Sequence, residues 1–119
     1  MRNLKQLKVW SKAHELTLAI YQATSDFPKD ELYGLTSQIR RACTSIPSNI
    51  AEGCGRGSNA DMIRFRYIAS GSASELEKQL LLASDLELLD QANYQRLASE
   101  VIEVKRMLTS LIQRLKADG

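Results

Sequence analysis

Residues 94–115, YQRLASEVIEVKRMLTSLIQRL, contain the most regular apolar pattern in the chain. The apolar residues alternate between steps of three and four: Tyr94, Leu97, Val101, Val104, Leu108, Leu111 and Leu115. This spacing places them on one face of a helix that packs in a bundle. Asp90 is a suitable N-cap, because an aspartate side chain accepts hydrogen bonds from free helix amides. We therefore predict a long helix after Asp90.

Two segments in the first half of the chain have a similar periodicity. The first, predicted to be helical over residues 7–25, carries Val9, Ala13, Leu16, Ile20, Ala23 and Phe27. Pro28 ends it, because proline disfavours helical backbone in the residue before it. The second, predicted over residues 35–52, carries Leu35, Ile39, Ala42, Ile46 and Ile50. Glycines 53 and 55 are suited to end it as a helix C-cap.

The last predicted helix begins at residues 58–61, SNAD, which resemble a capping box with Asp61 in the usual glutamate position. Its apolar side carries Met62, Phe65, Ala69, Ala73, Leu76, Leu80 and Ala83. Short connections between four amphipathic helices predict an all-α fold, an antiparallel up-down four-helix bundle. We expect residues 1–119 to form a single domain, since the chain has no linker or repeat.

Two features suggest that the chain associates with itself. The first helix has a second row beside its apolar seam: Leu7, Trp10, His14, Thr17 and Tyr21. The helix that begins at residue 58 has a run of small residues at its centre, ASGSAS at 69–74. Gly71 weakens a helix, so either a neighbouring backbone approaches it closely or it is a simple weak point. We favour close approach and an oligomer.

Composition is that of an ordinary soluble globule, with 44% hydrophobic and 25% charged residues. No apolar run approaches the roughly 20 residues of a membrane span, and the first residues lack a signal-peptide core. We therefore expect a cytoplasmic protein that does not bind membranes. Cys43 and Cys54 are expected to be free thiols, because on one helix they lie roughly 16 Å apart, too far for a disulfide.

Net charge is +2, but the charge is unevenly distributed along the chain. Residues 1–66 hold ten basic and six acidic residues, whereas residues 67–119 hold six basic and eight acidic residues. This pattern fits either solvated helix faces or a surface that binds polyanions. The candidate nucleic-acid-binding residues are Lys5, Lys8, Lys12, Arg40, Arg41, Arg56, Arg64 and Arg66. Trp10 and Tyr33 are the aromatics expected to be exposed for base stacking.

The stretch IPSNIAEG, residues 46–53, places a proline inside a predicted helix. Pro47 cannot donate to the carbonyl of Cys43, so we expect a kink there, with nearby hydroxyl groups satisfying the backbone. Asn49 and Glu52 share a face beyond it. We predict that both are partly buried and form a structural polar network with the neighbouring helix. The expected partners there are Ser72, Ser74 or Glu75.

Catalytic and metal-binding patterns are weak or missing. His14 is the only histidine, which excludes a di-iron bundle and makes a metal site or a catalytic triad improbable. The loop GCGRG at 53–57 lacks the preceding strand and the lysine of a phosphate-binding loop. A cofactor-free mutase built on Arg40, Arg41 and Glu52 is the remaining enzymatic reading. We expect no enzyme, no cofactor and no metal.

Four motifs resemble the 23S rRNA intervening-sequence proteins of bacteria: LKVW at 7–10, FPKDELYGLTSQIRR at 27–41, SIPSNIAEG at 45–53 and GSASELE at 71–77. The resemblance covers about residues 4 to 115. It implies an up-down four-helix bundle that assembles as a homopentamer. Accessory proteins of diversity-generating retroelements are distantly similar, and they bind nucleic acid and a reverse transcriptase.

Two functions remain in competition. The first is a non-enzymatic oligomer that binds the backbone of RNA or DNA through a basic surface. The alternative is an oligomeric scaffold that binds a protein partner. Binding of a polyanion weakens steeply with salt, whereas an apolar protein contact does not, so salt dependence separates the two.

Overall fold

The computed structural model describes residues 7–118, which form four long α-helices and one short 3₁₀ turn. The elements are α1 (Lys8–Thr24), η2 (Lys29–Glu31), α2 (Leu35–Cys54), α3 (Asn59–Asp85) and α4 (Gln91–Asp118). Within these residues there is no strand. The predicted all-α class with four helices is confirmed, and α3 and α4 are 27 and 28 residues long.

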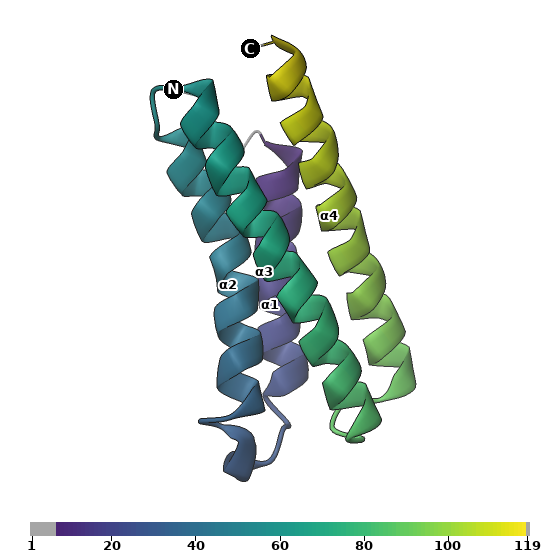
Figure 1. Ribbon diagram of the computed structural model, residues 1–119. Coiled ribbons are helices and arrows are strands. Elements are labelled where there is room, and N and C mark those ends of the chain that lie inside the picture. Colours follow the sequence, from purple (N-terminus) through teal and green to yellow (C-terminus); the bar gives the residue numbers. More distant parts are fainter. Residues whose placement is uncertain (1–6, 119) are drawn as a thin grey trace.

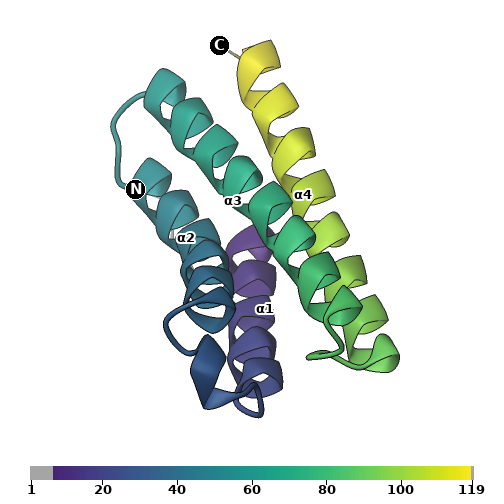
Figure 2. The same ribbon diagram turned by 60° about the horizontal axis from the view of Figure 1, so that its bottom comes forward.

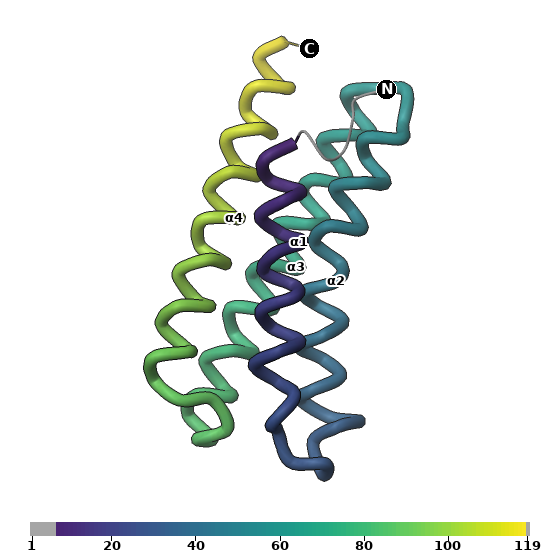
Figure 3. The backbone as a smooth tube through the Cα atoms, turned by 180° about the vertical axis from the view of Figure 1, so that it is seen from behind, coloured from purple at the N-terminus to yellow at the C-terminus, as the bar shows by residue number. Residues whose placement is uncertain are grey.

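The helices run along an elongated molecule that measures 46 × 22 × 20 Å. Consecutive helices run in opposite directions, so α1 begins and α4 ends at the same end (Figure 1). α1 packs against α2 and α4 (Figure 3), and α3 packs against the same two helices (Figure 2). Because α1 has only 17 residues, the last turns of α4 extend beyond it.

The predicted apolar seams meet in one core between the helices. The seam of α4 is buried at Leu97, Val101, Val104, Leu108, Ile112 and Leu115. It differs from the prediction at Tyr94, which is only partly buried, and in one later turn, where Ile112 is buried and Leu111 is only partly buried. A seam with alternating steps of three and four rotates around a straight helix by about 20° per heptad. The buried position therefore moves from Leu111 to the next residue, Ile112.

The predicted N-caps of α3 and α4 are confirmed. The Ser58 hydroxyl accepts a hydrogen bond from the amide of Asp61 at 3.2 Å. The Asp90 carboxylate accepts one from the amide of Asn93 at 2.7 Å. Each side chain satisfies an amide that has no partner within its helix, which fixes the residue at which that helix begins.

Close helix packing occurs at Gly53 and not at Gly71. A Cβ atom at Gly53 would lie 3.1 Å from Cβ of Phe65 and 3.4 Å from the carbonyl oxygen of Met62. The last turn of α2 therefore packs directly on the first turns of α3. At Gly71 no atom of the described chain lies within 4 Å of such a Cβ, so the predicted close approach is wrong within one chain.

α2 continues through Pro47 as one helix, and the kink expected there stays a prediction. Proline leaves the buried carbonyl of Cys43 without its usual helix donor. The Thr17 hydroxyl of α1 lies 3.2 Å from this carbonyl oxygen and 2.8 Å from that of Ala13, and its one hydrogen is shared between the two in a bifurcated bond. The donor therefore comes from another helix, not from the neighbouring hydroxyl groups that the sequence suggested.

The connection after α3 places Glu87 in the left-handed region, at φ 62°. The amide of Leu88 donates to the carbonyl of Ala83 at 2.9 Å, and the amide of Glu87 donates to that of Ser84 at 3.0 Å. This pair of bonds is the Schellman motif, in which glycine usually occupies the left-handed position. A glutamate there is strained, because its Cβ approaches the backbone.

Thr17→Val should lower the free energy of unfolding by about 1–3 kcal/mol, because the Cys43 carbonyl would be buried without a donor. Thr109→Val is the matched control, since the exposed Thr109 hydroxyl bonds only the Lys105 carbonyl of its own helix, at 3.0 Å. Urea unfolding at one protein concentration measures both. Equal effects of the two substitutions would contradict a role for Thr17 at the proline.

Glu87→Gly should raise the free energy of unfolding by about 1 kcal/mol, because glycine adopts a positive φ without steric cost. Glu87→Ala removes the same charge but keeps Cβ, so it should give little or no gain. Thermal unfolding of the two variants separates strain from electrostatics. A similar gain in both variants would show that charge repulsion is the cause.

Candidate nucleic-acid interface

One end of the bundle carries an excess of positive charge. At this end, uppermost in Figure 1, α1 begins, α2 joins α3 and α4 terminates, and we call it the basic end. Its cations are all exposed: Lys8, Lys12, Arg56, Arg64, Arg106, Arg114 and Lys116. Its carboxylates are Glu52, Asp61, Glu103 and Asp118. Cations outnumber acids here among the described residues, so the basic end attracts anions.

The opposite end, formed by the connections from α1 to α2 and from α3 to α4, is acidic. Its carboxylates are Asp26, Asp30, Glu31, Asp85, Glu87 and Asp90, and its cations are Lys29, Arg40, Arg41 and Arg96. Helix dipoles contribute little to this difference, because antiparallel helices place two N-termini and two C-termini at each end. The difference in potential comes from the side chains.

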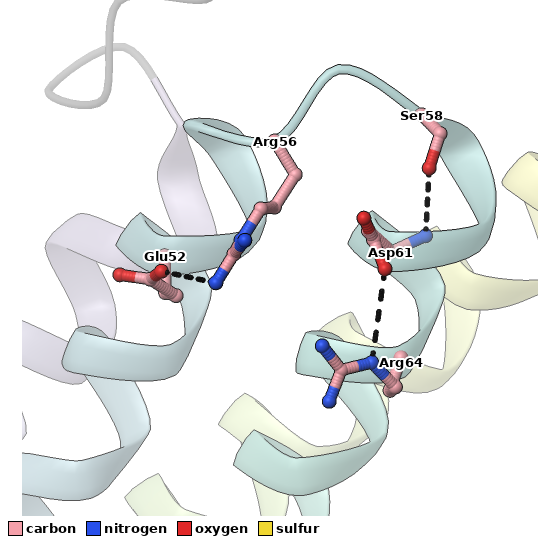
Figure 4. Close-up of polar contacts among 5 residues, drawn as sticks. All are labelled: Glu52, Arg56, Ser58, Asp61 and Arg64. Carbon is pink, nitrogen blue, oxygen red and sulfur yellow. Dashed lines mark hydrogen bonds and ion pairs between the residues drawn. The ribbon is translucent and has the colours of Figure 1, made fainter.

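Two predicted cations, Arg56 and Arg64, lie at the connection between α2 and α3 (Figure 4). Arg56 donates to the Glu52 carboxylate at 2.8 Å, and Arg64 lies 3.8 Å from the Asp61 carboxylate. The two arginine side chains remain 45% and 58% exposed. Both guanidinium groups lie over the ring of Phe65, 5.1 and 4.4 Å from its centre. One aromatic ring therefore holds two cations together while water still reaches them.

Three cations of the basic end were missed by sequence reasoning. Arg106, Arg114 and Lys116 belong to the acidic half of the chain, yet the fold brings the end of α4 beside the start of α1. The Lys116 ammonium donates to the Tyr67 hydroxyl at 2.7 Å and lies 5.2 Å from the centre of that ring. The predicted antiparallel order of the helices could have identified these three cations, because it places the last turns of the fourth helix near Lys8.

Arg66 was predicted to be a surface cation, but the structure buries it. Its side chain is only 1% exposed, and one guanidinium nitrogen donates to the carbonyl oxygen of Leu111 at 3.5 Å. Arg66 follows Phe65 and precedes Ala69 by one turn, so it shares the buried side of α3 with them. The expectation that Arg66 contacts nucleic acid at the surface is therefore wrong, because no ligand reaches it there.

Arg40 and Arg41 lie away from the basic end, and Lys5 lies outside the described residues. Arg40 donates to the Thr24 hydroxyl at 3.0 Å and the Tyr21 carbonyl at 3.3 Å, and its guanidinium stacks 4.6 Å from the centre of the Tyr21 ring. Arg40 therefore closes the last turn of α1. Arg41 is exposed on α2.

The predicted polar network between α2 and α3 is present in part. The hydroxyls of Ser45 and Ser72 are 2.8 Å apart, which joins the two helices. The Asn49 amide donates to the Ser45 hydroxyl at 2.9 Å and to the Ser45 carbonyl at 2.8 Å. Asn49 and Ser72 therefore belong to one chain of hydrogen bonds, with Ser45 as the link that sequence reasoning missed.

Glu52 and Glu75 do not belong to this network. Glu52 is 54% exposed and pairs with Arg56, one turn along the helix. Glu75 is exposed and accepts a hydrogen bond from Gln79 at 3.2 Å. The expectation that Glu52 is partly buried is wrong, because its position faces away from the packed face of α2. As a surface ion pair it stabilises the fold by about 0–1 kcal/mol.

A polar groove of about 440 Å³ lies beside the network, along α2 and α3. It is lined by Gln38, Arg41, Ala42, Thr44, Ser45, Ser48, Ser72 and Glu75. The described lining of the groove contains no histidine, cysteine or lysine. It offers serine and threonine hydroxyls and the Glu75 carboxylate, which can form hydrogen bonds with a polar ligand.

The two cysteines lie inside the fold. Cys43 and Cys54 are both buried and unpaired, as predicted. Burial raises the pKa of the Cys43 thiol to about 11, so at neutral pH it is protonated and unreactive. Among residues 7–118 no group of histidine, cysteine, aspartate and glutamate side chains could hold a metal ion. In the same range, no helix is long and apolar enough to cross a membrane.

The two aromatics predicted to stack on bases differ in their surroundings. Tyr33 is 94% exposed and lies beyond η2, at the acidic end. Trp10 is half-buried and stacks on His14, with ring centres 5.0 Å apart and planes 8° apart. At the basic end the Tyr67 ring is 50% exposed, but the Lys116 ammonium contacts it. This end is therefore suited to recognise charge more than base sequence.

Comparison with known proteins supports the resemblance seen in the sequence. The family model of the 23S rRNA-intervening sequence protein matches residues 5–110. A crystal structure of a protein with unknown function from the S23 ribosomal protein family of Bacteroides thetaiotaomicron is similar, with a TM-score of 0.79 and 29% identity. The similarity covers 87% of this chain and 97% of that chain. No curated protein matches the chain. The chain belongs to the 23S rRNA-intervening sequence protein family.

Proposed function

We propose that this protein is a non-enzymatic, oligomeric four-helix bundle of the bacterial cytoplasm that binds the phosphate backbone of RNA or DNA. The basic end is the binding surface, and it uses Lys8, Lys12, Arg56, Arg64, Arg106, Arg114 and Lys116. The observation that carries the proposal is the separation of charge along the molecule. An acidic end opposite a basic end orients a polyanion toward one surface only.

The geometry of the basic end favours backbone contacts over sequence readout. Arg56 and Arg64 present guanidinium groups, which bind phosphate oxygens in pairs. Each is partly neutralised by a carboxylate, so one bundle binds weakly. No helix here presents a row of amide side chains of the kind that reads base edges in a groove.

Self-association multiplies these weak contacts. Exposed apolar side chains supply surface for a second copy: Tyr67, Ile68, Leu81 and Leu82 on α3, Leu86 just after α3, and Ile102 on α4. The open space at Gly71 lies on α3, and a backbone from another copy would fill it. The family resemblance implies five copies. A closed ring presents five basic ends to one nucleic acid, which raises avidity without new contacts.

The second candidate function is a scaffold for a protein partner. It is favoured by exposed apolar side chains at the acidic end, where Tyr33 is 94% exposed and Leu32 45% exposed. Tyrosine and arginine are frequent anchors of protein interfaces, and Arg41 lines the same groove as Tyr33. Binding there would respond little to salt.

Binding of RNA or DNA should weaken as salt rises from about 50 to about 200 mM, as measured by fluorescence anisotropy. Arg56→Ala combined with Arg64→Ala should reduce the slope of log affinity against log salt by up to about 2 per bundle that contacts the strand. Arg96→Ala is the matched control, since Arg96 is an exposed arginine of the acidic end. Loss of affinity in the control, or binding that ignores salt, would favour the scaffold.

Light scattering at micromolar concentration should give a mass several times that of the 13.3 kDa chain. Leu82→Glu should shift the mass toward the monomer, because it places a charge on the exposed apolar side of α3. Lys78→Glu is the control on the same helix, since it changes charge without removing an apolar side chain. A mass near that of one chain for the unmodified protein would exclude the oligomer.

A further inference from the structure

An open groove of about 430 Å³ lies at the basic end, between the start of α1 and the last turns of α4. It exists because α4 extends beyond the much shorter α1. Its residues are Leu7, Lys8, Val9, Glu103, Arg106, Met107, Ser110, Leu111 and Arg114. We call it the α1–α4 groove. It combines an aliphatic floor with a rim of charged side chains.

The rim of the groove is suited to phosphate. Lys8, Arg106 and Arg114 provide three cations, and Glu103 pairs with Arg106. α1 begins at Lys8 inside this groove, and its first turn contains no acidic residue. Leu7, at the N-cap position, has no side-chain acceptor for the first amides of α1. A helix start flanked by a lysine and an arginine attracts a phosphate group.

The floor of the groove is suited to a flat apolar body. Met107 and Leu111 are partly buried and pack against the core from its edge. Methionine adapts its shape to an aromatic partner, and its sulfur makes favourable contacts with rings. Volumes of roughly 300–1,000 Å³ are typical of small-molecule sites, so a nucleobase fits here.

We infer that the α1–α4 groove accepts one unpaired nucleotide of a single-stranded nucleic acid, an inference that rests on the proposed function. The phosphate lies at the start of α1, between Lys8 and Arg114. The base lies over Met107 and Leu111, where the guanidinium of Arg106 can stack on it. The protein therefore prefers single strands over duplexes.

The arrangement of the cations favours a nucleotide over a small amphiphile with one anionic head. Lys8 and Arg114 hold the phosphate, which leaves the Arg106 guanidinium to stack on a flat ring. An aliphatic amphiphile has no such ring. A duplex does not fit the floor, because its bases are stacked and expose only their edges.

The test compares an unstructured oligouridylate of about 20 nucleotides with an RNA duplex of the same length, by fluorescence anisotropy at about 50 mM salt. The unmodified protein should bind the single strand about fivefold more tightly, or better. Ser110→Trp fills the groove from an exposed position without changing charge. It should abolish this preference and leave duplex affinity unchanged.

Thr109→Trp is the matched control, because Thr109 is the exposed neighbour of Ser110 and does not line the groove. It should retain the preference for the single strand. Ser110→Leu, a smaller filling group, should reduce the preference if the tryptophan variant does not fold. Equal affinity of the unmodified protein for both RNAs, or a preference that survives in Ser110→Trp and Ser110→Leu, would overturn the inference. Failure of both RNAs to bind in a salt-dependent way would instead overturn the proposed function.

Discussion

Burial of one apolar seam from each of four helices is the constraint on which the structure depends. None of the helices is stabilised by propensity alone, because most of the stability of a helix in a protein comes from the packing of its apolar face. Their shared core of leucine, isoleucine, valine and alanine side chains supplies the missing stability, at about 1.5–3 kcal/mol for each large aliphatic residue fully removed from water. Every charged group then has to lie on an outer face, at an end of the bundle, or beside a polar partner.

Polar groups near this core depend on hydrogen-bond partners from a neighbouring helix. Pro47 removes a backbone donor in the middle of α2, and Thr17 supplies one from α1. Ser45 and Ser72 join α2 to α3 by a direct contact between hydroxyls. Such bonds add little net stability, but an unsatisfied buried carbonyl costs about 1–3 kcal/mol. These hydrogen bonds therefore fix the position of each helix relative to its neighbour, because sliding one helix along the other would break the bonds.

The basic end follows from the same architecture. The apolar seams occupy the inner faces along the length of the bundle, so the charges that differ between the two ends are those near helix termini and connections. Arg56 and Arg64 lie at one connection, and Arg114 and Lys116 lie on the last turns of α4. The unequal lengths of α1 and α4 leave an aliphatic strip uncovered beside these cations. Charge and exposed apolar surface thus occur together at this end, which is the combination that the proposed binding of single strands requires.

The sequence by itself determined the helices, their order and most of the core. Periodicity placed Val101 and Leu108 in the core, and hydroxyl and carboxylate chemistry identified Ser58 and Asp90 as caps, because these signals are local to a few helical turns. It also identified Arg56 and Arg64 as surface cations, and both are exposed.

Only the tertiary structure decided the surroundings of single side chains that depend on another helix. In the structure Arg66 is buried and Glu52 is exposed. The Thr17 hydroxyl donates to the carbonyl of Cys43, and Arg114 lines the same groove as Lys8. The rotation of each helix about its axis and the relative lengths of the helices set these contacts. A shift of one residue turns a helix face by 100°, which the spacing of a single segment does not resolve.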